Sequence, residues 1–134
     1  MCLREAVVTE KNLQTLLRSI NPKLHADPIA FATAETAPAE AICTFREDEG
    51  LTVLVRTSDA ERLALPYSYV AAWITLTVDS DLDAVGFLAA ITERLANANI
   101  SCNVVSAVHH DHLFVPFDRR DDAVRILREM QSDV

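Results

Sequence analysis

The sequence predicts an α+β fold in which antiparallel strands form a sheet and helices pack on one face of it. Three observations in residues 67–134 support this prediction. Residues 73–78 alternate apolar and polar side chains, residues 85–95 repeat apolar side chains at helical spacing, and two further apolar runs flank His110-Asp111. A period of two is typical of a half-buried strand, and a period of 3.6 is typical of an amphipathic helix. The predicted order in this half is β-α-β-β-α.

The first half is expected to contain short elements separated by chain breakers. Apolar residues at positions 13, 16, 17 and 20 form a helical stripe that stops at Asn21-Pro22, because proline cannot continue a helix. Three strands follow, and the acidic turn at 47–50 precedes the third. The expected strands cover residues 28–34, 41–46 and 51–55, and Ser58-Asp59 starts a short helix.

The second half is expected to contain longer elements. In the strand at 73–78, Ile74, Leu76 and Val78 share one face, which needs a cover. The next helix supplies that cover, since residues 80–83 resemble a capping box and residues 97–99 end the helix. Two strands, a turn and a last helix complete the half. They are the strands 100–108 and 113–117 around His110-Asp111, and the helix opened by Asp118 with Ala123, Ile126, Leu127 and Met130 inward.

This order of elements, together with the stretches VGFLAAI at 85–91 and LANANISCNV at 95–104, resembles the ACT domain. ACT domains are the small regulatory modules of aspartate kinases and related amino-acid enzymes. The resemblance covers the second half at the level of motifs and implies a ferredoxin-like fold. The whole chain resembles a stand-alone ACT-domain protein of the uncharacterised bacterial type.

The first half is interpreted as a degenerate copy of the second. A strand at 51–55 and an acidic helix start at 59–63 parallel the strand at 113–117 and the helix start at 122–126. We therefore expect two ACT-like halves, at residues 1–66 and 67–134. The second half lacks the closing strand that an ACT fold requires, so that strand is expected from the first half or from a second subunit.

The resemblance implies where a ligand would bind. In the family, the turn from the first strand to the first helix and the start of the second strand bind a free amino acid or form a subunit contact. In this sequence the implied residues are Asp81, Leu82, Val85, Gly86 and Phe87 in the turn, and Ser101, Cys102, Asn103 and Val104 in the opposite wall.

Gly86 and three aspartates bear on that implied site. Glycine inside a helix costs about 0.5–1 kcal/mol relative to alanine, so Gly86 suggests close approach by a ligand or by a neighbouring strand or helix. Asp79, Asp81 and Asp83 lie near the expected helix start, where each serves capping and solubility. Together they would repel a bare anion. A ligand bound here should therefore carry a positive group.

His109, His110, Asp111 and His112 form a run with the ligand types that zinc prefers. No Cys or Glu stands at a sequence spacing that is usual for metal ligands, and side chains splay around a tight hairpin. A turn is therefore favoured over a metal site. Nucleophile elbows, phosphate loops and zinc-protease motifs are absent from the sequence. We expect neither an enzyme nor a cofactor, and isolated His25 is given no role.

Composition narrows the possible partners. Twelve basic and 20 acidic residues give a net charge of −8, which opposes binding to nucleic acid. No apolar run suffices to span a bilayer. Cys2, Cys43 and Cys102 lack paired spacing and follow no signal peptide, so they are expected to be reduced thiols in a cytoplasmic protein.

The expected function is therefore that of a regulatory or sensor protein which binds a small molecule, most simply a free amino acid. The missing closing strand and the aromatic junction at 67–73 predict a homodimer. Two alternatives stay open. One is an assembly module with an empty pocket, and the other is a metal-dependent enzyme that uses the histidines at 109–112.

Overall fold

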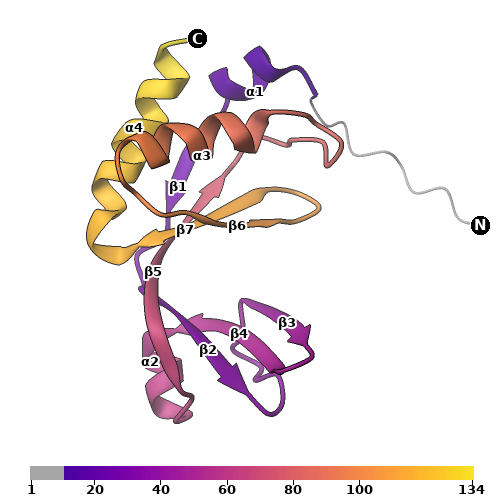
Figure 1. Cartoon of the computed structure of the whole chain (residues 1–134), viewed down its shortest axis with the longest axis vertical. Helices are drawn as coiled ribbons and strands as arrows, with labels where there is room; N and C mark the ends of the chain where they lie inside the picture. Colours follow the sequence, from indigo (N-terminus) through magenta and orange to yellow (C-terminus); the bar gives the residue numbers. More distant parts are fainter. Residues whose placement is uncertain (1–10) are drawn as a thin grey trace, which may run out of the picture.

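The computed structural model describes residues 11–134, and Cys2 lies outside them (Figure 1). The expected classes of element are present in the expected order, with one additional short strand near the start. In chain order the elements are α1 (Leu13–Arg18), β1 (Pro22–Leu24), β2 (Ile29–Ala34), β3 (Cys43–Glu47), β4 (Gly50–Arg56), α2 (Thr57–Arg62), β5 (Tyr67–Leu76), α3 (Phe87–Asn97), β6 (Asn103–Ser106), β7 (Asp111–Pro116), the 3-10 turn η1 (Phe117–Arg119) and α4 (Arg120–Ser132).

The strands within the described residues form one sheet of seven strands in the order β3-β4-β2-β5-β7-β6, with β1 also paired to β5. Every pairing in it is antiparallel. The order β3-β4-β2-β5 in the first half matches the order β6-β7-β5-β1 in the second. Each half therefore places its second, third, first and closing strands side by side, which confirms the predicted α+β class and the two related halves.

The closing strand of the second half comes from the first half of the same chain. β1 pairs with the end of β5, in the register Pro22 to Leu76 and Leu24 to Ile74. β5 also serves both halves, because its start pairs with β2 while its end pairs with β1 and β7. Of the two predicted donors, the structure thus uses the first half. α1 and β1 precede residue 66 in the chain but complete the second half of the structure. The division of the chain at residue 66 therefore stays a prediction.

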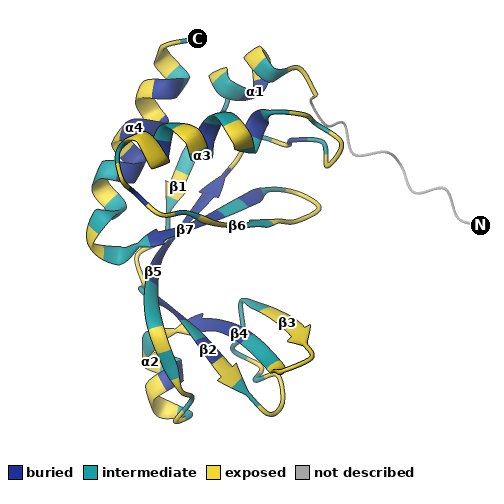
Figure 2. Ribbon diagram, in the orientation of Figure 1, coloured by how far each residue is buried: buried dark blue, intermediate teal, exposed yellow. Residues whose placement is uncertain are grey.

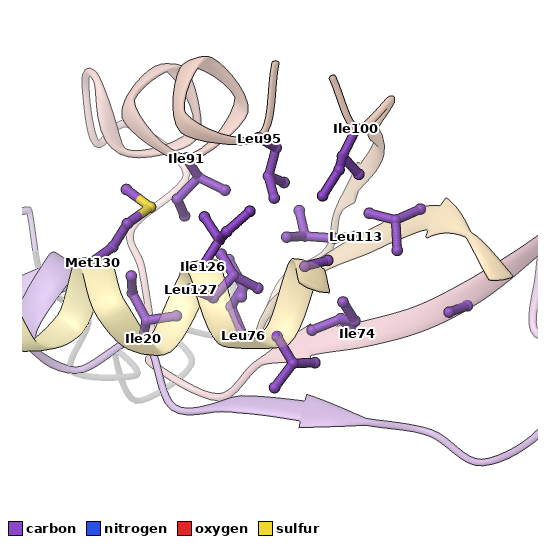
Figure 3. Packing of buried hydrophobic residues seen from close by; sticks show 14 of the residues in the cluster. Ile20, Ile74, Leu76, Ile91, Leu95, Ile100, Leu113, Ile126, Leu127 and Met130 are labelled. Atoms are coloured by element: carbon purple, nitrogen blue, oxygen red, sulfur yellow. The ribbon is translucent and has the colours of Figure 1, made fainter. Parts of the chain in front are cut away.

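The helices lie on one face of the sheet. Ala72, Ile74 and Leu76 of β5 point into a core formed with α1, α3 and α4. Figure 3 shows how side chains from α3, α4 and the sheet meet in this core. Ala30 belongs to a smaller cluster under α2 and pairs with Val70, which shares the Ile74 face of β5. All of the helices that pack against the sheet therefore cover the same side.

The first half is less fully covered. Residues 35–42, which run from β2 to β3, contain no helix at the position where the second half has α3. The cluster under α2 consists of the small side chains Ala30, Ala32, Val53, Val55 and Ala60. Figure 2 shows that β3 is mostly exposed, whereas β5 and β7 are mostly buried or half-buried. No helix within residues 11–134 has the length and apolar character needed to cross a membrane.

Several boundaries differ from the sequence expectation. The second-half helix begins at Phe87 and not at 80–83, because Gly86 has φ of +91°, outside the helical region. Gly86 therefore precedes the helix, and the expectation of a glycine inside it was wrong. Asp111 and His112 belong to β7 and not to the hairpin turn, and β6 spans only Asn103–Ser106. Asp118 falls in η1, so α4 begins later than expected.

Candidate ligand site at the turn between β5 and α3

The segment between β5 and α3 is a turn held by its own hydrogen bonds. The Asp81 carboxylate accepts a hydrogen bond from the Asp83 amide at 2.7 Å, and the Asp81 carbonyl accepts one from the Ala84 amide at 2.9 Å. Such local side-chain bonds are the reason that Asp favours turns over helix interiors. Gly86 then redirects the chain through its positive φ, which glycine adopts without strain. The turn therefore fixes the connection between the end of β5 and the start of α3.

A small pocket of about 130 Å³ lies beneath this turn. Its walls come from residues of the turn, from the first turn of α3 and from the end of the β6–β7 hairpin. The lining residues include Ser80, Asp81, Leu82, Phe87, Ser106 and Asp111. The two hairpin residues reach the pocket because Ser106 pairs with Asp111, and Asp111 pairs on its other side with Leu76 at the end of β5.

Asp111 is the polar centre of the pocket. Its side chain is only 5% exposed, and Ser80, also buried, donates a hydrogen bond from Oγ to Asp111 Oδ2 at 2.7 Å. A carboxylate offers about four acceptor positions on its two oxygens, so a single hydroxyl leaves acceptor capacity for a bound cation. Burial also strengthens its attraction for a positive group, because water screens less in the interior. The pocket thus favours a ligand with an ammonium or similar group.

The start of α3 provides the opposite polarity. Gly86 is the N-cap residue, and glycine has no side chain with which to cap the helix. By contrast, Asn12 caps α1 by accepting a hydrogen bond from the Thr15 amide at 3.1 Å. The first amides of an α-helix lack partners within the helix and carry partial positive charge. Phe87 and Leu88, in the first turn of α3, both line the pocket.

The structure brings together only part of the site implied by the family resemblance. Asp81, Leu82, Gly86 and Phe87 line the pocket, whereas Val85 points away from the protein with 86% of its surface exposed. A methyl group built on Gly86 would meet only Leu13 Cδ2, at an ordinary contact distance of 3.8 Å. Gly86 is thus explained by its backbone conformation, without close approach of another group.

The second implied segment lies elsewhere. β5 and β6 are both antiparallel to β7, so β6 ends, and does not start, beside the turn at 80–86. Asn103 and Val104 line a different cleft, on the side of β3, and Ser101 is exposed. Cys102 packs against the main core, where burial raises the pKa of its thiol to about 11. Their proposed role in ligand binding stays a prediction.

Sequence reasoning missed the residues that complete the pocket. The sequence suggests Ser80 only as a helix cap and Asp111 only as a turn residue or a metal ligand, and it gives no signal for Ser106. One signal could have identified Asp111. If the strand expected at 113–117 is started two residues earlier, Asp111 falls beside the end of β5. The strong turn tendency of the sequence His-His-Asp-His concealed that possibility.

The histidines have separate structural roles. His112 Nδ1 accepts a hydrogen bond from Trp73 Nε1 at 3.0 Å, which places the proton of the neutral ring on Nε2. Thr75 Oγ1 lies 3.0 Å from the same nitrogen and 2.8 Å from His25 Nε2. The His25 ring stacks on Trp73, with 3.6 Å between ring centroids. This network ties the segment after β1 to β5 and β7.

No metal-binding geometry is formed by the run at 109–112. His110 lies 3.5 Å from Asp79, His112 belongs to the network on the face of the sheet away from the helices, and His109 is exposed. Across residues 11–134, no group of three or more His, Cys, Asp or Glu side chains is placed to hold a metal ion. The metal-dependent alternative therefore gains no support from the described geometry.

Comparison with protein families gives two matches, which together cover most of the chain. One model of the ACT domain matches residues 8–72, and a second model of the ACT domain matches residues 68–129. The two matches overlap within β5, the strand that both halves use. No curated protein matches the chain.

Solved structures give the same result for the fold. A protein of unknown function from Vibrio cholerae, described as a possible transport protein, is 39% identical, with 89% of this chain and 95% of that chain covered and a TM-score of 0.80. A protein from Agrobacterium tumefaciens is 20% identical, with 82% and 87% covered and a TM-score of 0.63. A chain of the aspartokinase α and β subunits is 10% identical, with 81% and 95% covered and a TM-score of 0.55. The last two likenesses concern the fold alone.

Proposed function

The chain belongs to the ACT-domain family, with two ACT domains, and from that premise we propose that it is a cytoplasmic regulatory or sensor protein that binds a free amino acid. The observation that carries this proposal is the buried carboxylate of Asp111 in a pocket beneath the start of α3. ACT domains typically bind small regulatory molecules. The pocket described above is the place where this chain offers the matching chemistry.

The two polarities of the pocket fit the two charges of a free amino acid. An ammonium group would bind Asp111, where a buried carboxylate is partnered by the Ser80 hydroxyl. A carboxylate would bind the first amides of α3, because the N-cap residue Gly86 has no side chain to occupy them. The negative charge of Asp111 disfavours ligands that carry only an anion. This arrangement agrees with the sequence-based expectation that the ligand carries a positive group.

The size of the pocket restricts the amino acid. A cavity of about 150 Å³ accommodates benzene, which has six heavy atoms. At about 130 Å³, the pocket accepts ligands of comparable size. Glycine, alanine and serine are therefore the preferred candidates, and long side chains would have to extend past the rim.

Regulation would follow from linkage between ligand binding and subunit arrangement. Leu82, Val85 and Val108 are exposed apolar residues on the turn and on the β6–β7 hairpin, with exposed fractions of 65%, 86% and 66%. A second copy that covers them would bury apolar surface and form a dimer at the mouth of the pocket. A ligand that binds one arrangement more tightly shifts the population toward it, and a partner protein would detect that change.

Thermal-shift measurements with each free amino acid test the proposal, because a ligand that binds only the folded state raises the melting temperature. At a ligand concentration of 100 times Kd, the gain is about 2.7 kcal/mol. Asp111→Asn keeps the shape of the side chain and removes its charge, so calorimetry should show at least a roughly 30-fold loss of affinity. Asp83→Asn is the matched control, since Asp83 is exposed and does not line the pocket.

The same exposed apolar residues favour a second candidate function, a ligand-free assembly module. In that case no amino acid would raise the melting temperature, and Val85→Lys with Val108→Lys, at exposed positions outside the pocket lining, would still convert a dimer to a monomer in light-scattering measurements. Amino-acid binding that persists in this double variant would instead support the sensor function. A monomer at all concentrations in the unmodified protein would contradict the dimer.

A further inference from the structure

A second cleft lies on the face of the sheet that carries no helix. It is bordered by β3 and β6, which stand at the two ends of the strand order, so the sheet must curve toward this face to bring them to one cleft (Figure 1). The cleft has a volume of about 390 Å³. Pockets for small molecules commonly have volumes of about 300–1,000 Å³. Its size is therefore sufficient for a ring-containing ligand.

The floor and walls of the cleft are apolar. Phe114 and Leu54 form a buried floor, with exposed fractions of 1% and 4%. Phe31 packs edge-on against Phe114, with 5.5 Å between ring centroids and 81° between ring planes. Phe45 stands on β3 at the border with 69% of its surface exposed. A bound ring would cover Phe45 and extend the aromatic packing of Phe31 and Phe114.

One wall of the cleft supplies hydrogen-bonding groups. All four residues of β6, Asn103–Ser106, line it. Successive side chains of a strand point to opposite faces, so four consecutive residues indicate that the edge of the strand itself faces the cleft. Among the described strands β6 pairs only with β7, which leaves backbone N–H and C=O groups along its other edge. Thr52 also lines the cleft, and its hydroxyl, which donates a hydrogen bond to Glu47 Oε1, keeps acceptor capacity.

The lining of this cleft is uncharged. None of its ten lining residues is charged, although 24% of the chain consists of charged residues. The groove beside α4, in contrast, is lined by Asp121, Arg125, Arg128, Glu129 and Asp133. An apolar lining with a few hydrogen-bonding groups selects neutral ring systems and disfavours charged ligands, whose desolvation would not be compensated.

We propose that this cleft is a binding site for an uncharged aromatic small molecule, which stacks against Phe45 and Phe31 and forms hydrogen bonds with the β6 edge. This cleft differs from the pocket at Asp111 in the ligand that it selects, because the pocket favours a charged amino acid and the cleft favours an uncharged ring. Ser106 of β6 lines both sites, so binding at one site would change the affinity of the other through β6.

Fluorescence titration with N-phenyl-1-naphthylamine, a neutral aromatic probe, tests this site. We expect saturable binding of one probe molecule per chain. Phe45→Lys should weaken that binding about tenfold, because it replaces an apolar contact with a charge. Thr44→Lys is the matched control, since the neighbouring residue on β3 is also exposed but points to the opposite face. It should leave the affinity unchanged.

Cys43 gives an independent readout because its side chain lines the cleft. In a Cys2→Ser variant, saturating probe should slow alkylation of Cys43 by iodoacetamide at least fivefold. Probe binding without saturation, equal loss in both lysine variants, or unprotected Cys43 would overturn the proposal. Protection of Cys43 by raised protein concentration alone, with loss of self-association in Phe45→Lys, would identify the cleft as a contact between copies and also overturn it.

Discussion

The most quantitative prediction concerns the contribution of α1 to the second half of the protein. Leu16 lies in α1, more than 50 residues before β5 ends, yet it is completely buried in the core formed with α3 and α4. Leu16→Ala removes three buried carbon atoms and leaves a cavity, for which the cost in other buried leucines is about 3 kcal/mol, within a range of 2.7–5.0 kcal/mol. The free energy of unfolding should fall by about that amount.

The corresponding change in melting temperature follows from chain length. With 134 residues and an unfolding entropy of about 2.1 cal/mol/K per residue, a loss of 3 kcal/mol lowers Tm by roughly 10 °C. Urea unfolding followed by the fluorescence of Trp73, the single tryptophan, measures the change. Leu82→Ala, at an exposed position, should change stability by less than about 0.5 kcal/mol. A loss below about 1 kcal/mol in Leu16→Ala would refute the packing of α1 in this core.

Three further predictions follow from the described geometry. Burial lowers the pKa of His25 and His112 below the unfolded value of about 6.5. Their contribution to stability is therefore complete above pH 6.5 and is lost as pH falls from that value through the lower pKa of the folded state. Urea unfolding at pH 7.5 and 5.5 should show this loss of stability, and replacing both histidines with glutamine should reduce the loss. Gly86→Ala should destabilise by about 1–2 kcal/mol in thermal unfolding, because φ is +91° there, and an unchanged Tm would contradict this assignment. Burial raises the pKa of Cys102 to about 11, so iodoacetamide should label it at pH 8 roughly 200-fold more slowly than a free thiol of pKa about 8.5, and rapid labelling of the native protein would contradict its burial.

The sequence predicts the fold well where side-chain periodicity determines a single buried face. Ile74 and Leu76, and Ala123 with Leu127, are core residues as their spacing indicates. Prediction failed for β1, because its three residues, Pro22–Leu24, are too few to show periodicity and are fixed by pairing with β5. The start of α3 was misplaced since a capping pattern at 80–83 competes with the positive φ of Gly86, which only the turn geometry determines.

The candidate site was predicted only in its local part. Turn residues such as Asp81 and Phe87 are neighbours in sequence, so a motif can identify them. Asp111 enters the pocket through strand register, which depends on the pairing of β7 with both β5 and β6. Ser106 enters by the same pairing. Such contacts between distant segments have no local signal, and a shift of one residue in register would turn Asp111 to the other face.

The central claim is that the pocket at Asp111 binds a small amino acid through both of its charges. The most direct test is a titration of glycine, alanine and serine into ¹⁵N-labelled protein, followed by amide chemical shifts, with propionate as an analogue of alanine that lacks the ammonium group. We predict that at least one of the three amino acids shifts the signals of residues 80–88, Ser106 and Asp111, and that propionate at the same millimolar concentration does not. Equal shifts with propionate, or amino-acid shifts confined to other residues, would contradict the account.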